Sequence, residues 1–133
     1  PYVGADYVQR AKKAFTQLGK YVPDENFTLY SANISEIMEK LLECDEPRFR
    51  CVLCKRAMYR IAQQFARKQN AKGIVTGESM GQVASQTLDN LYVLDNAATI
   101  PVIRPLIALD KVEIEHISQR IGTYQITAKT VNG

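Results

Sequence analysis

The feature that most constrains the fold of this chain is a glycine-containing run that directly follows a short apolar segment. Residues 73–76 (GIVT) are predicted to form a β-strand, and the run Gly77-Glu78-Ser79-Met80-Gly81-Gln82-Val83-Ala84-Ser85-Gln86-Thr87 leads into an amphipathic helix. Backbone N–H groups in such a turn can approach an anion closely, and the helix dipole favours negative charge there. The run therefore predicts a nucleotide or phosphate site. The simpler alternative is a plain strand-to-helix turn with Ser79 or Ser85 as the helix cap, and no Gly-Lys-Ser/Thr follows, so the run is not a Walker A loop.

Predicted helices and strands alternate along the rest of the chain. The helices cover residues 6–18, 34–42, 49–69, a stretch with Val83, Leu88 and Leu91 that ends near 94, and 110–121, and the extended segments cover 27–32, 74–76 and 100–105. This order predicts an α/β fold with a parallel sheet in a three-layer α/β/α arrangement. Three strands are few for such a sheet, so we expect residues 1–133 to form a single domain that is incomplete at its N-terminus. Ligands of open α/β sheets bind beyond the carboxyl ends of the strands, where the Gly77 turn lies.

Composition bounds the class of protein. The 133 residues are enough for one domain with a real core, and the net charge of +3 does not by itself require a nucleic-acid partner. The sequence has no apolar run long enough to span a membrane and no signal-peptide pattern. Its three cysteines, without a secretory signal, indicate free thiols in a reducing compartment, so we expect a cytoplasmic protein.

The charge is distributed unevenly. The stretch between Pro47 and Gly77 has no Asp or Glu and carries eight basic residues: Arg48, Arg50, Lys55, Arg56, Arg60, Arg67, Lys68 and Lys72. A basic helix near an anion-binding turn would suit nucleotide phosphates, and its outer face would suit an RNA backbone. A solvated helix face is the competing interpretation.

Two cysteines lie three residues apart on the predicted helix 49–69. Cys51 and Cys54 can point the same way and could share a metal or iron–sulfur site, with Cys44 as a third ligand from the preceding loop. They also share an apolar stripe with Met58, Ile61 and Phe65, and free cysteines are commonly buried. Core thiols and metal ligands therefore both remain open.

Lys111 lies in the first turn of the predicted helix 110–121, where the helix dipole disfavours a cation. Such a lysine is tolerated when it faces a bound anion, and a flexible surface lysine beside Asp110 is the alternative. The buried face of this helix is predicted to carry Ile114, Ile117 and Ile121. The single histidine, His116, has no paired acid or nucleophile and is interpreted as structural or surface.

Four segments together resemble one family. The run Gly77 to Leu88, the segment Pro101-Val102-Ile103-Arg104-Pro105-Leu106-Ile107, the pair Asp110-Lys111 and the segment Ile121-Gly122-Thr123-Tyr124 closely resemble the catalytic domain of the ThiI family. These are tRNA 4-thiouridine sulfurtransferases, which some bacteria also use in thiamine biosynthesis. The resemblance covers most of the chain from about Arg48 onward.

This resemblance implies a PP-loop ATP pyrophosphatase fold, similar to the adenine nucleotide alpha hydrolases, with ATP and Mg²⁺ as cofactors. ATP would adenylate a uridine oxygen of tRNA, and a sulfur donor protein or sulfide would then displace AMP. By resemblance, Gly77 and Gln86 match nucleotide-contacting positions, one of Lys55 and Arg56 matches a basic ATP contact, and Lys111 matches a lysine of the activation step. There the lysine would offset charge that develops on the leaving pyrophosphate. The resemblance also implies no membrane association and is compatible with a homodimer.

The chain departs from the family pattern in three places. The phosphate-gripping Ser-Gly-Gly-x-Asp-Ser loop and the RNA-binding module would precede Pro1, and the family's cysteine after the Gly-Thr-Tyr segment is not reached before Gly133. We therefore expect this fragment alone to be inactive. Some archaeal relatives carry a Cys-x-x-Cys near this position that is thought to bind an iron–sulfur cluster, which makes a cluster at Cys51 and Cys54 as well supported as core thiols. Another PP-loop adenylating ligase and a non-catalytic nucleotide- or RNA-binding module remain the alternative functions.

Overall fold

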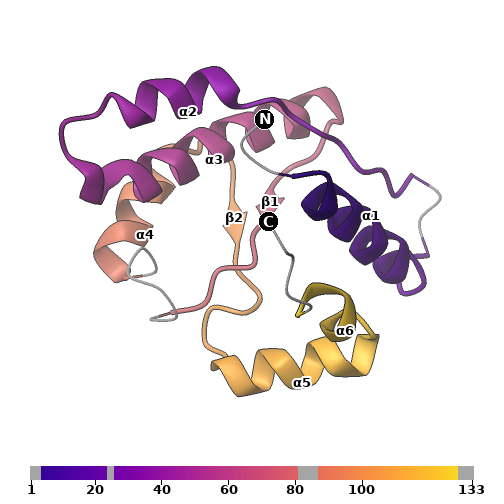
Figure 1. Cartoon of the computed structure of the whole chain (residues 1–133). Coiled ribbons are helices and arrows are strands. Elements are labelled where there is room, and N and C mark those ends of the chain that lie inside the picture. Colours follow the sequence, from indigo (N-terminus) through magenta and orange to yellow (C-terminus); the bar gives the residue numbers. More distant parts are fainter. Residues whose placement is uncertain (1–3, 24–25, 81–86, 129–133) are drawn as a thin grey trace. The chain divides into compact units, whose positions relative to one another are not determined.

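The computed structural model describes residues 4–23, 26–80 and 87–128. Its elements, in chain order, are α1 (Ala5–Gly19), α2 (Ser35–Leu42), the 3-10 turn η1 (Pro47–Phe49), α3 (Arg50–Lys68), β1 (Ile74–Val75), α4 (Leu88–Asp95), β2 (Val102–Ile103), α5 (Lys111–Ile121) and α6 (Tyr124–Thr127) (Figure 1). They fall into two compact units: residues 36–110, and residues 1–35 together with 111–133. Each unit is described by itself.

The unit 36–110 is built around two parallel strands that lie side by side in Figure 1. Ile74 of β1 is opposite Val102 of β2, and Val75 is opposite Ile103. Hydrogen bonds continue past the strands, because the Thr76 N–H donates to the Ile103 carbonyl at 3.0 Å and the Met80 N–H donates to the Ile107 carbonyl at 3.1 Å. The segments that follow both strands therefore run together, and the predicted α/β class is confirmed.

The core of this unit lies between α3, α4 and β1. Leu94 is fully buried, and the other buried apolar side chains are Val52, Tyr59, Ala66, Ile74, Leu91 and Ala97. One buried polar side chain from α3 is also paired, because the Gln63 carboxamide oxygen accepts from the Thr99 N–H at 2.6 Å. Satisfying this group avoids the cost of a buried unpaired amide.

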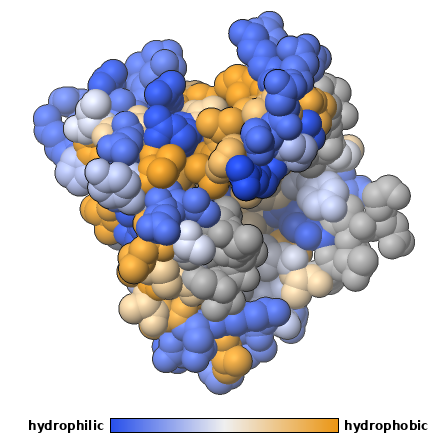
Figure 2. Space-filling view, turned by 90° about the vertical axis from the view of Figure 1, so that its left-hand side faces the viewer, coloured by the Kyte–Doolittle hydropathy of each residue, from blue (hydrophilic) through white to orange (hydrophobic). Residues whose placement is uncertain are grey.

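The buried face of α3 differs from the predicted stripe. Val52, Tyr59, Gln63 and Ala66 point inward, whereas Cys51 is exposed and Met58 is 49% exposed. The helix therefore turns a partly polar face inward, since the Tyr59 hydroxyl donates to the buried Glu78 carboxylate and the Gln63 amide oxygen accepts from the Thr99 backbone N–H. Figure 2 shows hydrophobic side chains reaching the surface between hydrophilic ones, and the exposed apolar residues of this unit include Leu42, Leu53, Met58, Leu88 and Tyr92.

The strand predicted over residues 27–32 is wrong. These residues are described and belong to no strand, and the Phe27 ring instead stacks on Phe15 of α1 with the ring centroids 4.3 Å apart. A β-prone segment becomes a strand only where a partner satisfies its backbone groups. The segment belongs to the unit of residues 1–35 and 111–133, whose described part contains helices and no strand.

In the unit of residues 1–35 and 111–133, α1 and α5 each pack on α6. The Gln17 side-chain amide donates to the Ile121 carbonyl at 2.8 Å, and Gly122, with φ of 79°, ends α5 as predicted. Of the predicted buried face of α5, Ile114 and Ile121 are half-buried, but Ile117 is 37% exposed. His116 is exposed, which favours its interpretation as a surface residue.

The predicted helices 6–18, 34–42 and 49–69 agree with α1, α2 and α3 to within one residue at each end. The predicted helix that ends near residue 94 corresponds to α4, although Val83 lies outside the described residues. None of the helices in the described ranges is long and apolar enough to cross a lipid bilayer.

Candidate functional site

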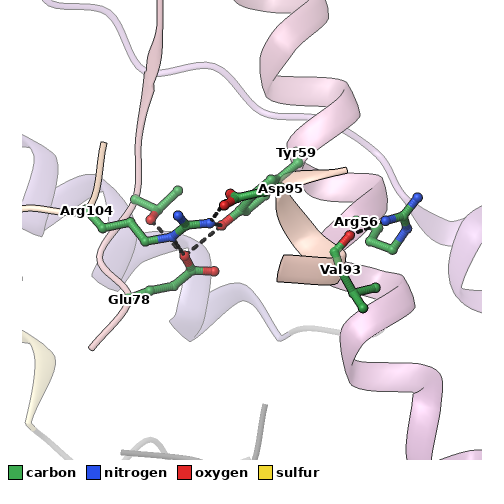
Figure 3. Close-up of polar contacts among 7 residues, drawn as sticks. Arg56, Tyr59, Glu78, Val93, Asp95 and Arg104 are labelled. Carbon is green, nitrogen blue, oxygen red and sulfur yellow. Dashed lines mark hydrogen bonds and ion pairs between the residues drawn. The ribbon is translucent and has the colours of Figure 1, made fainter. Parts of the chain in front are cut away.

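The site lies at the carboxyl ends of β1 and β2. Arg104 directly follows β2, and Glu78 comes three residues after β1. Because parallel strands present their carboxyl ends at the same edge of a sheet, the two side chains meet there (Figure 3). Their closest atoms, Arg104 Nε and Glu78 Oε2, are 2.6 Å apart.

This ion pair is the centre of a hydrogen-bond network. Glu78 Oε2 also accepts from the Tyr59 hydroxyl at 2.6 Å and from the Thr76 hydroxyl at 3.0 Å. Arg104 Nη2 donates to the Tyr59 hydroxyl oxygen at 3.0 Å and to Asp95 Oδ1 at 2.6 Å. The network thus joins both strand ends to α3 and to the last residue of α4, as Figure 3 shows.

The side chains of Arg104 and Glu78 are only 13% and 9% exposed, whereas that of Asp95 is 53% exposed. Burial by itself raises the pKa of Glu78, but hydrogen bonds from Tyr59, Arg104 and Thr76 outweigh it and hold the pKa below its ordinary value. Burial raises the pKa of Tyr59, and its hydrogen bond to Glu78 adds to this rise. The network therefore carries a fixed carboxylate, a neutral phenol and a cationic guanidinium at neutral pH.

Gly77 lies between β1 and this network. A Cβ at Gly77 would have no atom of the described residues within 4 Å, whereas a Cβ at Gly73 would lie 3.1 Å from the Pro101 carbonyl oxygen. A side chain at position 73 would therefore be crowded against the backbone of the segment before β2. At Gly77 the described residues leave space, and a ligand could approach the backbone there.

The residues around the turn show that Ser79 does not cap the helix that follows. Ser79 is buried and its hydroxyl donates to the Leu109 carbonyl at 2.8 Å, so it ties the two strand-end segments together and is not the helix cap. The cap of α4 is Thr87, whose hydroxyl oxygen accepts from the Asn90 N–H at 3.3 Å. Ser85 and Gln86 lie outside the described residues.

A depression of about 460 Å³ adjoins the network. Arg104 and Asp95 form its charged part, and its other lining residues are Met80, Leu88, Leu91, Tyr92, Val102 and Ile107. Apolar walls with a small number of placed polar groups are the usual composition of a small-molecule site.

The two predicted basic contacts on α3 are both half-buried. The Arg56 guanidinium donates to the Val93 carbonyl of α4 (Figure 3), so this side chain already holds α3 against α4. Lys55 lies one helical turn before Tyr59, which belongs to the network. Arg48 and Arg50 also contact protein groups, as Arg48 pairs with Glu46 and Arg50 donates to the Leu42 and Cys44 carbonyls.

The three cysteines are free thiols. Cys51 is exposed in the first turn of α3, and Cys54 is half-buried with its sulfur 3.8 Å from the sulfur of Met38. Burial, followed by the charge of Cys51, raises the pKa of the Cys54 thiol. Cys44 contacts the Glu46 carbonyl. Within the described ranges, no group of three or more His, Cys, Asp or Glu side chains is arranged to hold a metal ion.

Lys111 opens α5, as predicted, in the unit of residues 1–35 and 111–133. Its side chain is 76% exposed, and its ammonium nitrogen lies 3.9 Å from Glu115 Oε1, one turn further along α5. A pair this exposed contributes little to stability, so folding alone gives no strong reason for a lysine at this helix start.

Sequence patterns alone do not indicate a role for Tyr59, Glu78, Asp95 or Arg104. A signal for two of them was available: Glu78 and Arg104 are opposite charges that each follow an apolar extended segment. Two parallel strands would bring those charges to one edge. Tyr59 and Asp95 could not be found this way, because their roles depend on how α3 and α4 pack.

The fold and the site define an α/β protein with a hydrogen-bonded charge network at the carboxyl ends of two parallel strands. Residues 1–132 match the family described as "Thiamine biosynthesis protein (ThiI)". The chain belongs to the ThiI family, and the resemblance found in the sequence is confirmed.

Several curated relatives carry the name "Probable tRNA sulfurtransferase". The chain is 40% identical to that of Thermococcus kodakarensis over 95% of its own length and 34% of the relative's. It is 38% identical to that of Methanothermobacter thermautotrophicus over 96% of its own length and 33% of the relative's, and 43% identical to that of Saccharolobus islandicus over 84% and 30%. The chain thus spans about a third of the length of these relatives.

A solved structure is also similar. Its title is "Crystal structure of a 4-thiouridine synthetase - RNA complex with bound ATP", and the chain superimposes on it with a TM-score of 0.87 and 32% identity. The match covers 98% of this chain and 34% of that one.

Proposed function

We propose that this chain is the C-terminal portion of the PP-loop ATP pyrophosphatase domain of a tRNA sulfurtransferase that makes 4-thiouridine. The observation that carries the proposal is the structural match to a 4-thiouridine synthetase solved with RNA and bound ATP. This match covers 98% of the chain. The strand-end edge, with its open space at Gly77, provides a site in keeping with it. We propose the cytoplasm as the compartment, where tRNA and reduced thiols occur together.

The proposed reaction has two steps. A uridine oxygen of tRNA attacks the α-phosphorus of ATP, a new P–O bond forms, and the bond to pyrophosphate breaks. Sulfide, supplied free or released by a donor protein, then attacks the uridine carbon that bears this oxygen. A carbon–sulfur bond forms, and the carbon–oxygen bond breaks to release AMP. Mg²⁺ would accompany ATP, because it neutralises phosphate charge in most enzymes that cleave nucleotides.

Four sequence positions receive proposed roles in the first step. Gly77 lets the nucleotide approach the backbone, Gln86 contacts the nucleotide, and Lys111 offsets charge on the departing pyrophosphate. One residue of the pair Lys55 and Arg56 contacts ATP. Because Arg56 is already bonded to the Val93 carbonyl, separate alanine variants of the two would assign the contact.

We further propose Cys51 and Cys54 as two ligands of an iron–sulfur cluster. The three-residue spacing of Cys51 and Cys54 places both positions on one side of α3, where Cys51 is exposed and Cys54 half-buried. Two cysteines cannot complete a cluster, which takes four protein ligands as a rule, so further ligands must come from elsewhere. Iron in anaerobically purified native protein that Cys51→Ala removes would support this role, and iron-free protein would contradict it.

The test of the function is nucleoside analysis of unmodified tRNA after incubation with the native protein that carries this chain, ATP, Mg²⁺ and sulfide. We expect 4-thiouridine to form, and to depend on ATP. Release of AMP without tRNA would instead identify a ligase that acts on a small molecule. Binding of ATP or RNA without any AMP would identify a non-catalytic binding module.

A further inference from the structure

A second polar surface lies on α1 and its C-cap residue Lys20, in the unit of residues 1–35 and 111–133. Together with Ile126 of α6 it lines a depression of about 440 Å³, and its residues are Gln9, Lys12, Lys13, Thr16, Gln17 and Lys20. These six positions are spaced by three or four residues, or follow one another directly, so they occupy one face of the helix. We call its three cations, Lys12, Lys13 and Lys20, the lysine stripe. Lys12, Lys13 and Lys20 are exposed.

The three lysines Lys12, Lys13 and Lys20 form no ion pair with another described residue. Ion pairs of the described residues include those of Arg48, Arg104 and Lys111. The basic stretch of α3 differs, because Arg50, Arg56 and Arg67 of that helix all donate to protein groups. The lysine stripe therefore holds positive charge that the described fold does not use.

The stripe has a fixed backbone. Gln17 lies within it, and its amide donates to the Ile121 carbonyl at the end of α5. The lysines therefore project from a helix that is anchored within its own unit, and the spacing of their backbone positions is fixed. From Lys12 to Lys20 the helix rises by about 12 Å at about 1.5 Å per residue.

We propose that the lysine stripe, Lys12, Lys13 and Lys20, contacts the phosphate backbone of the RNA substrate. This rests on the proposed function, which supplies tRNA as the partner. Lysine ammonium groups, with amide and hydroxyl groups between them, are typical phosphate contacts. Among the described residues, Ile126 is the only apolar side chain in the lining, so this part of the surface lacks both the apolar core of a protein interface and the apolar groups that enter a lipid surface.

The test measures how tRNA binding by the native protein depends on salt. Each phosphate contact contributes roughly 0.7 to 0.9 to the slope of log K against log salt. The triple variant Lys12→Gln, Lys13→Gln, Lys20→Gln should therefore lower the magnitude of that slope by about 2 to 3. The matched control, Lys40→Gln, Lys68→Gln, Lys72→Gln, removes the same charge from α2, α3 and the segment before β1, and should leave the slope near the wild-type value.

An unchanged slope in the stripe variant would overturn the inference, and so would an equal loss in both variants, which would reflect net charge alone. A loss in the control variant only would assign the RNA contact to α3 and also overturn it. Because all six lysines are exposed, urea unfolding should give the same midpoint for every protein. If tRNA is bound in a stripe-dependent way but never thiolated, the proposed function fails while the surface assignment holds.

Discussion

At the scale of single residues, the site depends on a charge pair that is almost fully buried. Arg104 and Glu78 are stable there because the surrounding groups complete their hydrogen bonds: Tyr59 and Thr76 donate to the carboxylate, and Asp95 accepts from the guanidinium. A buried pair that is satisfied in this way need not stabilise the fold relative to an apolar core. Removing only one of the two charged side chains is costly, because the other charge is then buried without a counterion.

Replacing Arg104 should therefore destabilise the protein far more than replacing Asp95. Arg104→Ala leaves the buried Glu78 carboxylate without its cation and should cost about 3–5 kcal/mol of unfolding free energy. Asp95→Asn loses a pair in which the acid is 53% exposed, and should cost less than about 1 kcal/mol. Urea unfolding of both variants measures the difference, and equal losses would show that the network is not buried as described.

The same network predicts a dependence on acid. Since the folded-state pKa of Glu78 lies below its ordinary value of 4.5, its stabilisation is present above about 4.5 and is lost as the pH falls through the folded-state pKa. The unfolding free energy of the wild type should thus fall more steeply below pH 4.5 than that of Glu78→Gln. Denaturation curves on both sides of that pH measure the slopes, and parallel slopes would be inconsistent with a lowered pKa.

Gly73 and Gly77 should respond differently to replacement by alanine. Gly77→Ala adds a methyl group that has no atom of the described residues within 4 Å, so unfolding free energy should stay within about 0.5 kcal/mol of wild type while ATP binding weakens. Gly73→Ala places a methyl group 3.1 Å from the Pro101 carbonyl and should destabilise the β1–β2 edge. Calorimetry with ATP and urea unfolding separate the effects. Unchanged ATP affinity in Gly77→Ala would argue against a nucleotide beside this turn.

At the scale of elements, local patterns predicted where helices occur and much less well which faces they bury. Apolar spacing gave α1, α2, α3 and α5 nearly correct ends, since caps, glycines and periodicity act within a few residues. The buried face of α3 was wrong, because Tyr59 and Gln63 turn inward only where Glu78 and Thr99 offer partners. The segment 27–32 failed for a related reason: β-propensity cannot reveal whether a neighbouring strand exists.

The end of α5 gives a prediction at this scale. Gly122 has φ of 79°, and a Cβ there would also lie 2.5 Å from the Gln17 amide nitrogen that anchors α1. Gly122→Ala should therefore destabilise by more than about 1 kcal/mol. Gly19→Ala, at the last residue of α1, would meet Phe27 at an ordinary 3.6 Å and should stabilise slightly, by up to about 1 kcal/mol. Thermal unfolding compares the two, and a neutral Gly122→Ala would contradict the strained geometry.

At the scale of the whole molecule, the family is established and the activity remains a proposal. The chain matches the ThiI family over residues 1–132, yet it covers about a third of the length of its curated relatives. The run from Gly77 carried enough of the family pattern to predict the family and the fold class. The network of Tyr59, Glu78, Asp95 and Arg104 at the strand ends came only from packing.

The most direct test of the account is the AMP formed from ATP by the native protein in the presence of unmodified tRNA, compared between wild type and Lys111→Ala. Because the Lys111 side chain is 76% exposed, the variant should fold and bind tRNA as the wild type does. We expect the wild type to release one AMP for each 4-thiouridine formed, and Lys111→Ala to release almost none. A wild type that thiolates tRNA without releasing AMP would contradict adenylation, and a variant with full activity would remove Lys111 from the reaction.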